Sequence, residues 1–363
     1  MSSRYISPVS AQRGITIVEV MVTMAIGLIL LVALGTMLVG SLKSFKVQDA
    51  FSRMQESGAF ALNAIGNDIR MAGFYGQIGS FDITMATGEP ADPVGSAGGT
   101  DCGTGWSVQI SQPVLGIVGS TAAAASAAYP CIVSANFLGG SPILILRGAT
   151  GIPTLADDLP DDDSLYVQST PGRGILFRAQ SLRDASATNR LLDPWLVRTD
   201  DASGNTVPAL IYPYQAKMYY VRPCSRPSGS GGAQCTATDD DGQPIPTLVR
   251  QELVGLSMVE QPVAEGVERF SLLYGIDTDN DGAANRYVAA NLVTNWLEVT
   301  SIRVAMLIRS PVITKGYNDS NKSYDLGDGA AAFTCTAGVN CGYHRHVFSQ
   351  TFQLRNLSQR REI

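Results

Sequence analysis

Histidine is scarce in this sequence, and the patterns of common catalytic and nucleotide-binding sites are absent from it. The 363 residues include two histidines, His344 and His346, which are too few ligands to form a metal site alone. There is no P-loop, no dinucleotide-binding fingerprint followed by a helix, and no serine or cysteine nucleophile in a recognisable elbow. We therefore expect no enzymatic activity.

Basic residues are also few. Lysine and arginine number 26 against 32 aspartates and glutamates, the net charge is −6, and no basic tract occurs. Proteins that bind nucleic acids present clustered positive charge to the phosphates. We therefore expect no nucleic acid among the partners of this chain.

Charge of either sign is almost missing between Ile15 and Gly40, where Glu19 is the only charged residue. As a helix rising 1.5 Å per residue, this segment would be about 39 Å long. The hydrocarbon core of a bilayer is about 30 Å thick, so the segment is long enough to span it. An acidic residue at the membrane centre costs about 2.5–3.5 kcal/mol, less near an interface, and such residues are functional by default.

Two common explanations for this segment do not fit. A secretory signal peptide has a shorter apolar part and ends in a small-x-small cleavage site, and none follows here. A lipoprotein signal needs a cysteine directly after the apolar run, whereas the first cysteine is Cys102. A plain membrane anchor explains the length but not the position of Glu19.

The pattern resembles the prepilin signal of the type IV pilin family and its pseudopilin relatives. A short leader with Arg4 and Arg13 ends in Gly14, and Glu19 is the fifth residue after it. The resemblance implies that a prepilin peptidase of the inner membrane cuts after Gly14 and methylates the new amino terminus at Ile15. The family usually has phenylalanine where this sequence has Ile15.

The resemblance implies a physical role for Glu19. Near the start of a helix, a negative charge is favoured by the unpaired N–H groups and the helix dipole. In a filament, the Glu19 carboxylate would also meet the positive amino terminus of a neighbouring subunit, and such a pair is costly to break in a low-dielectric surrounding. The alternative is a carboxylate that only reaches toward the lipid headgroups.

The helical pattern continues beyond Gly40. Apolar or small residues recur every three or four positions from Val47 to Ala72, and no proline occurs between Pro8 and Pro90. We predict one helix over 15–72, about 87 Å long, that ends at Gly73. The expected organisation is a leader (1–14), a helix with a transmembrane and assembly part (15–40) and an amphipathic part (41–72), and a periplasmic head (73–363).

Two further stretches resemble one branch of the family, the PilW-type minor pilins and the related pseudopilin J. They are the segment from Asn67 to Gly76, where the helix ends, and the last strand and its flank, from Arg345 to Asn356. The resemblance implies an α+β, pilin-like fold in which the long N-terminal helix packs on an antiparallel, β-rich head.

Short apolar runs between turn residues predict the strands of this head. The candidates are Trp106–Ile110, Val114–Val118, Ile143–Arg147, Leu165–Ser169, Ile175–Ala179, Trp195–Arg198, Tyr212–Val221, Leu248–Val254, Phe270–Ile276 and Trp296–Arg309. We expect loops at Ala122–Ala128 and Ser225–Gln243, the second of them a flexible hairpin. The alternative for Ala122–Ala128, which is mostly alanine, is a helical turn.

All six cysteines lie after residue 100, and none is in a C-x-x-C pair. An even number beyond a membrane span suggests disulfides in an oxidising compartment. Fifteen pairings are possible, and proximity in the sequence favours Cys102–Cys131, Cys224–Cys235 and Cys335–Cys341. Basic residues on the two sides of the apolar run nearly balance, so the cysteines place the head outside the cytoplasm. The alternative is six free thiols in a cytoplasmic domain.

An acidic loop follows Ile276. Asp277, Asp279 and Asp281 are spaced as D-x-D-x-D-G, and Asn285 offers a fourth oxygen. Calcium prefers such oxygen ligands, although Val288 occupies the position of the bidentate EF-hand glutamate. The sequence allows a calcium loop outside the EF-hand class or a turn whose acids cap their own backbone.

The sequence therefore predicts a minor pilin that takes part in type IV pilus assembly as a tip or priming subunit. The expected partners are the prepilin peptidase, other minor pilins and the major pilin. The expected location is the inner membrane with the head in the periplasm, and the pilus after assembly. The alternatives are a pseudopilin of a type II secretion system and a membrane-anchored periplasmic adhesin or enzyme.

Overall fold

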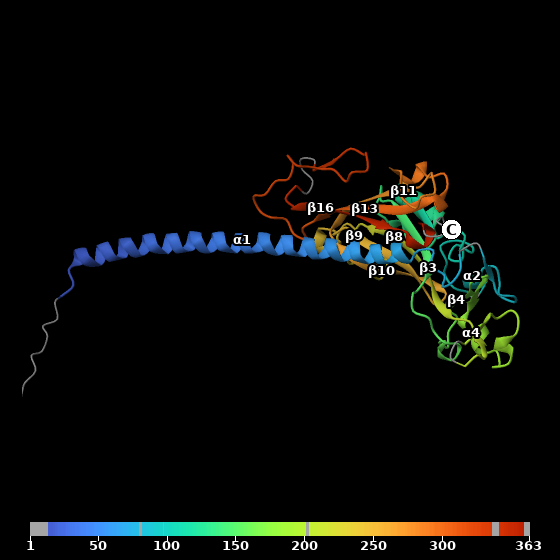
Figure 1. Ribbon diagram of the computed structural model, residues 1–363. Coiled ribbons are helices and arrows are strands. Elements are labelled where there is room, and N and C mark those ends of the chain that lie inside the picture. Colours follow the sequence, from blue (N-terminus) through green and yellow to red (C-terminus); the bar gives the residue numbers. More distant parts are fainter. Residues whose placement is uncertain (1–13, 80–81, 97, 201–202, 336–340, 359–363) are drawn as a thin grey trace, which may run out of the picture. The chain divides into compact units, whose positions relative to one another are not determined.

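A computed structural model describes residues 14–79, 82–96, 98–200, 203–335 and 341–358 (Figure 1). The chain divides into two compact parts, residues 1–51 and 52–363. Residues 1–13 of the expected leader lie outside the described range.

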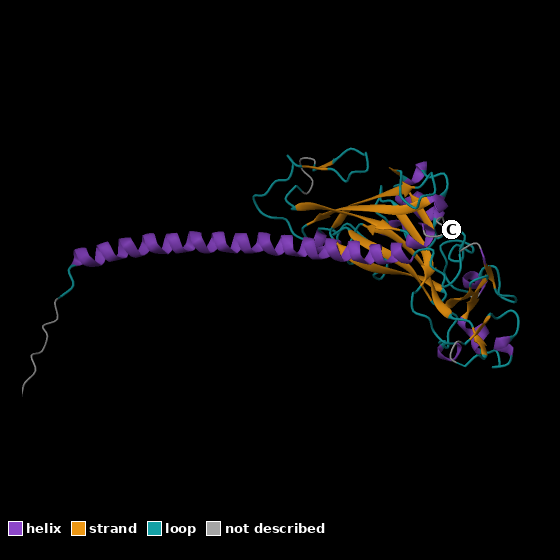
Figure 2. Cartoon of the chain, viewed as in Figure 1, coloured by secondary structure: helices purple, strands orange, loops and turns teal. Residues whose placement is uncertain are grey.

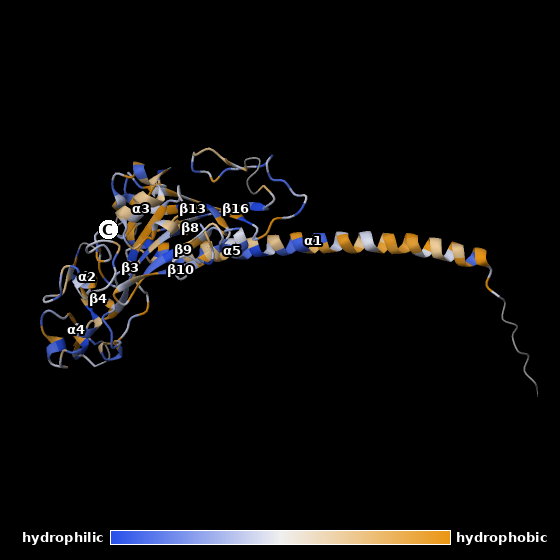
Figure 3. Cartoon of the chain, turned by 180° about the vertical axis from the view of Figure 1, so that it is seen from behind, coloured by the Kyte–Doolittle hydropathy of each residue, from blue (hydrophilic) through white to orange (hydrophobic). Residues whose placement is uncertain are grey.

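Helix α1 comprises Ile17–Met71. From Ile17 to Leu42 its large apolar side chains are exposed, and α1 is long and apolar enough to cross a membrane (Figure 3). The expected helix, 15–72, was two residues too long at its start and one at its end. The chain leaves α1 at Gly73, whose positive φ of 73° suits glycine and whose N–H donates to the carbonyl of Arg147 at 2.9 Å.

Within 52–363, the rest of α1 buries one face. Met54, Ala61, Ile65 and Ile69 recur at helical spacing and are each at most 1% exposed. They join one hydrophobic cluster with residues of both large β-sheets. This part of α1 therefore belongs to the core of the head.

The first large sheet has the strand order β1-β5-β4-β8-β3-β2, and β9 and β10 extend it through a further pairing of β9 with β8. The strands are β1 Ile83–Met85, β2 Val114–Ile117, β3 Ile143–Ala149, β4 Leu165–Thr170, β5 Arg173–Arg178, β8 Ile211–Arg222, β9 Thr247–Val254 and β10 Ser257–Glu265. Strand β8 is long enough to pair with β4 near its start and with β9 near its end. All described pairings are antiparallel except that of β1 with β5.

The second large sheet has the order β12-β11-β13-β16. Figure 2 shows the strands of the head in orange. Its strands are β11 Val267–Ile276, β12 Arg286–Val288, β13 Val299–Arg309 and β16 Arg345–Gln353. Two small ribbons join β6 Val197–Thr199 to β7 Thr206–Pro208 and β14 Ser323–Tyr324 to β15 Phe333–Thr334. The short helices are α2 Pro93–Ser96, α3 Ala122–Ala128, α4 Ala179–Arg183, α5 Asp239–Gly242 and α6 Arg355–Ser358. The α+β class with a long N-terminal helix on antiparallel sheets is confirmed.

Two expectations about local structure were wrong. The expected strand Trp106–Ile110 is a series of turns, held by the guanidinium of Arg147, which donates to the Trp106 carbonyl at 3.1 Å and lies over the indole ring. The expected loop Ala122–Ala128 is helix α3, because alanine has the highest helix propensity and the Thr121 hydroxyl accepts from the N–H of Ala124 at 3.2 Å.

Candidate functional site

Glu19 lies in the first turn of α1 and forms a reciprocal cap with Thr16. The Thr16 hydroxyl accepts from the N–H of Glu19 at 3.3 Å, and the Glu19 carboxylate accepts from the N–H of Thr16 at 3.5 Å. This is the capping box of the T-x-x-E pattern. This capping box explains why α1 begins at Ile17. Its T-x-x-E pattern is visible in the sequence.

The Glu19 carboxylate keeps capacity for a second partner. Its contacts with the N–H and hydroxyl of Thr16 measure 3.5 and 3.4 Å, at the long end of the range for hydrogen bonds, and its side chain is exposed. A charged donor at a shorter distance would bind this carboxylate more strongly than Thr16 does.

The proposed cleavage bond precedes the helix. Gly14, Ile15 and Thr16 have no helical or strand structure, and no described atom comes within 4 Å of a Cβ built on Gly14. An accessible backbone outside helices and strands is a form that a peptidase can bind. The geometry at Gly14 and Ile15 is therefore compatible with cleavage, which stays a prediction.

Asp68 ties the second part of α1 to the first large sheet. Its carboxylate accepts from the ammonium of Lys217 at 2.8 Å and from the hydroxyl of Tyr219, and it lies 3.6 Å from the guanidinium of Arg250. Glu252 completes the group through Arg250 at 2.6 Å. Burial, together with the Asp68 charge, raises the pKa of Tyr219 well above its usual value.

The register of β8 and β9 brings this group together. Lys217 pairs with Glu252 and Tyr219 with Arg250, so that their side chains share the sheet face beneath α1. Sequence reasoning placed Asp68 at the helix end but did not find its partners, because they are separated from it by about 150 residues.

The three disulfides join Cys102 to Cys131, Cys224 to Cys235 and Cys335 to Cys341, the pairings that proximity favoured. None of the described cysteines is free. The disulfides close loops with sequence separations of 29, 11 and 6 residues. Each disulfide therefore stabilises one local loop of the head.

We expect the longest of these loops to contribute the most stability. Replacing Cys102 and Cys131 by serine should lower the free energy of unfolding by about 4 kcal/mol, and replacing Cys335 and Cys341 by about 2 kcal/mol, because a longer loop gains more entropy when it is opened. Urea unfolding of the full chain in detergent measures both. Labelling of all six cysteines without a reductant would contradict the disulfides and the proposed topology.

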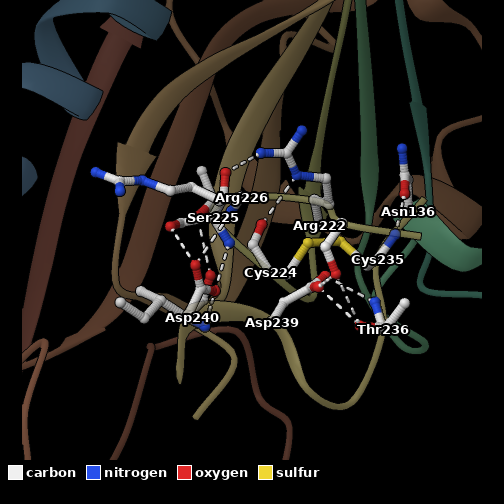
Figure 4. Close-up of a disulfide and its surroundings, with 12 residues drawn as sticks. Asn136, Arg222, Cys224, Ser225, Arg226, Cys235, Thr236, Asp239 and Asp240 are labelled. Carbon is white, nitrogen blue, oxygen red and sulfur yellow. Dashed lines mark hydrogen bonds between the residues drawn. A yellow bond between two sulfur atoms is a disulfide. The ribbon is translucent and has the colours of Figure 1, made fainter. Parts of the chain in front are cut away.

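The expected hairpin at Ser225–Gln243 contains an antiparallel bridge between Gly229 and Gln234. Two buried or half-buried carboxylates hold the backbone of this segment (Figure 4). Asp240 accepts from the N–H groups of Ser225 and Ile245, both at 2.8 Å. Asp239 accepts from the N–H of Thr236 at 2.7 Å. Burial opposes the charge on Asp240, but these backbone bonds prevail and lower its pKa.

The acidic loop after β11 is closed by its own hydrogen bonds. The buried carboxylate of Asp277 accepts from the N–H groups of Asn280 at 2.7 Å and Gly282 at 3.1 Å. The Asn285 side-chain oxygen accepts from the N–H of Thr278 at 2.6 Å. These contacts favour the self-capped turn over the calcium loop.

The donor set nevertheless remains compatible with a cation. Oxygens of Asp277, Asp279 and Asp281 lie within 4.8 Å of one another, whereas the amide nitrogen of Asn285, and not its oxygen, faces Asp279 at 3.1 Å. Calcium binding by the three aspartates therefore stays a proposal, with Asn285 as a loop-closing residue.

A calcium titration distinguishes the two interpretations. If the loop binds calcium, the ion at tenfold its dissociation constant should stabilise the full chain by about 1.4 kcal/mol, and Asp281→Asn should remove this effect. Thermal unfolding with and without calcium measures it. A thermal unfolding midpoint that does not change up to 10 mM calcium would contradict calcium binding and support the self-capped turn. This concentration is about ten times the weakest calcium dissociation constants of extracellular modules.

Comparison with known proteins agrees with this geometry. Residues 233–356 match the family model of type IV pilus-assembly protein W, and residues 9–35 match that of the prokaryotic N-terminal methylation motif. A type IV-like pilin from Thermus thermophilus is similar over 53% of this chain and 84% of its own, with 14% identity and a TM-score of 0.20. A search of curated proteins found no match.

An apolar helix with a capped carboxylate near its start, preceded by a methylation motif and followed by a β-rich head, defines a membrane-anchored pilin. The motif implies processing by a prepilin peptidase. Through the PilW match over residues 233–356 and the methylation motif over 9–35, the chain is a type IV pilus-assembly protein, a minor pilin. This is a family of pilus-assembly subunits and not of enzymes, and the match favours the pilus over the secretion machine.

Proposed function

We propose that this minor pilin primes filament assembly and remains at the filament tip. The observation that carries the proposal is the size of the head, roughly 290 residues from Gly73 to the end of the chain. Heads of this size would crowd one another in a filament built wholly of this chain. A subunit at the tip has no neighbour above it and avoids this crowding.

The proposal includes the processing and the partners of the chain. The prepilin peptidase cuts after Gly14 and methylates Ile15, and the apolar part of α1 then holds the chain in the inner membrane with its head in the periplasm. Three disulfides support an oxidising location for the head. Other minor pilins join it first, and the major pilin adds below them.

Counting and locating the chain in isolated filaments tests this function. Gold-labelled antibodies against the head should mark one end of each filament, and cells that lack the chain should make few filaments or none. Labels spaced along the whole filament, or a normal number of filaments without the chain, would contradict a tip or priming role.

A further inference from the structure

Strand β16 forms an open edge of the second large sheet. All nine of its residues, Arg345–Gln353, pair with β13 without a register shift, and within the described residues no other strand pairs with it. Ser349, Gln350 and Thr351 are exposed in succession, although neighbouring residues of a strand point to opposite faces. Both faces are therefore accessible at the middle of this edge.

The other long edge of the head, strand β10, is protected against pairing. It contains Pro262, which has no N–H, and its register shifts between Pro262 and Ala264. The N–H of Met258 is already bound to the carbonyl of Thr100 at 2.9 Å. Bulges, prolines and covering loops are the means by which proteins block strand addition, and β16 has neither a proline nor a bulge.

Strand β16 is packed directly on α1 and runs in the same direction. A Cβ on Gly58 would lie 2.8 Å from the ring of Phe348, and one on Gly66 would lie 2.2 Å from the ring of Phe352. Eight helix residues rise about 12 Å and four strand residues about 13 Å, so that the two elements stay aligned. The absent side chains at Gly58 and Gly66 let the strand lie close against the helix.

We propose that β16 receives an extended strand from the head of another pilin subunit, which adds to the second sheet at this edge. A row of alternating N–H and C=O groups is completed by extended backbone and by no other partner of comparable specificity. The exposed side chains at the middle of the edge, Ser349, Gln350 and Thr351, are uncharged, which suits a partner strand without charge. Pilins assemble through α1, and β16 lies against α1, which brings this edge next to a neighbouring subunit.

A second copy of this chain is not the partner in a symmetric pair. Antiparallel pairing of two β16 strands would make the two copies of α1 over 52–71 run in opposite directions, because each β16 is parallel to its own α1. Both copies must enter the same membrane from these segments. We therefore assign the partner strand to a different pilin.

Photo-crosslinking in pilus-producing cells tests this proposal on the full chain. Benzoylphenylalanine replaces Ser349, Gln350 or Thr351 in separate variants, and Val259, exposed on the protected edge of β10, is the matched control. We expect adducts with one extended segment of another pilin at all three positions, identified by mass spectrometry, and a yield at least about tenfold lower at Val259. No adduct at 349–351, an equal yield at Val259, or adducts only with a second copy of this chain would overturn the proposal.

Proline substitutions give a second measurement. Backbone N–H groups alternate in direction along an edge strand, so one of Ser349 and Gln350 donates toward β13 and the other away from it. The outward-facing proline variant should keep its unfolding midpoint and lose the crosslink from Thr351 by about tenfold. A crosslink that survives in both Ser349→Pro and Gln350→Pro would contradict strand addition. These results are independent of where in the filament the subunit lies.

Discussion

Replacing Glu19 by alanine should give cells that process the protein and keep it in the membrane but carry few pili or none. Loss of the carboxylate makes the helix easier to insert, by up to about 2.5–3.5 kcal/mol if the residue lies at the membrane centre. In the filament, however, the amino terminus of a neighbouring subunit would be left without its partner in an apolar surrounding. Counting surface filaments and blotting the membrane fraction measure both effects.

The capping box makes a sharper control possible. Thr16→Val removes the contacts of the Thr16 hydroxyl but leaves the carboxylate, whereas Glu19→Ala removes the carboxylate and keeps the bond from the N–H of residue 19 to the Thr16 hydroxyl. If Glu19 acts by pairing between subunits, Thr16→Val should keep most filaments, with a cost to the helix start of about 1 kcal/mol. Equal loss in both variants would assign Glu19 a capping role only. Normal filaments that contain the Glu19→Ala subunit would show that its charge has no part in assembly.

Replacing Asp68 by alanine should destabilise the head by about 3 kcal/mol, the lower end of the range for breaking a buried ion pair. The variant leaves the ammonium of Lys217, which is 8% exposed, with Glu252 at 3.5 Å as its remaining partner. It also removes the acceptor of the Tyr219 hydroxyl. Urea unfolding of the full chain in detergent should show a lower midpoint with an unchanged slope.

The matched control for Asp68 is on the same helix. Asn63 is exposed, and Asn63→Ala should change the free energy of unfolding by less than about 0.5 kcal/mol. If Asp68→Ala behaves like this control, the charged group under α1 does not hold the helix on the sheet.

The features that could be predicted from the sequence depend on neighbouring residues. The uncharged run, the 3–4 spacing up to Ala72 and the stop at Gly73 are local patterns, and the structure has α1 within two residues of the predicted bounds. The disulfides also followed from proximity, because each of them closes a short loop. The match to the N-terminal methylation motif rests on the same local signals, whereas the match to the PilW family lies in residues 233–356.

The features that were missed depend on distant residues. Strand β10 contains Glu260, Gln261 and Pro262, a composition that does not predict a strand. Its pairing with β9 makes this segment a strand despite that composition. Arg147 lies in an otherwise apolar strand and is fully buried, because the carbonyls of Trp106 and Gln112 bind its guanidinium. No pattern in the sequence around Arg147 predicts these two carbonyl partners.

The amino terminus of the mature chain is the most direct test of the account. The protein is purified from the membranes of a cell with an active prepilin peptidase, and its first residue is determined by mass spectrometry. The account predicts that the chain begins at Ile15, with a methylated amino group, and that a bulky residue in place of Gly14 leaves the leader attached. A mature chain that begins at Met1, or at any residue other than Ile15, would contradict it.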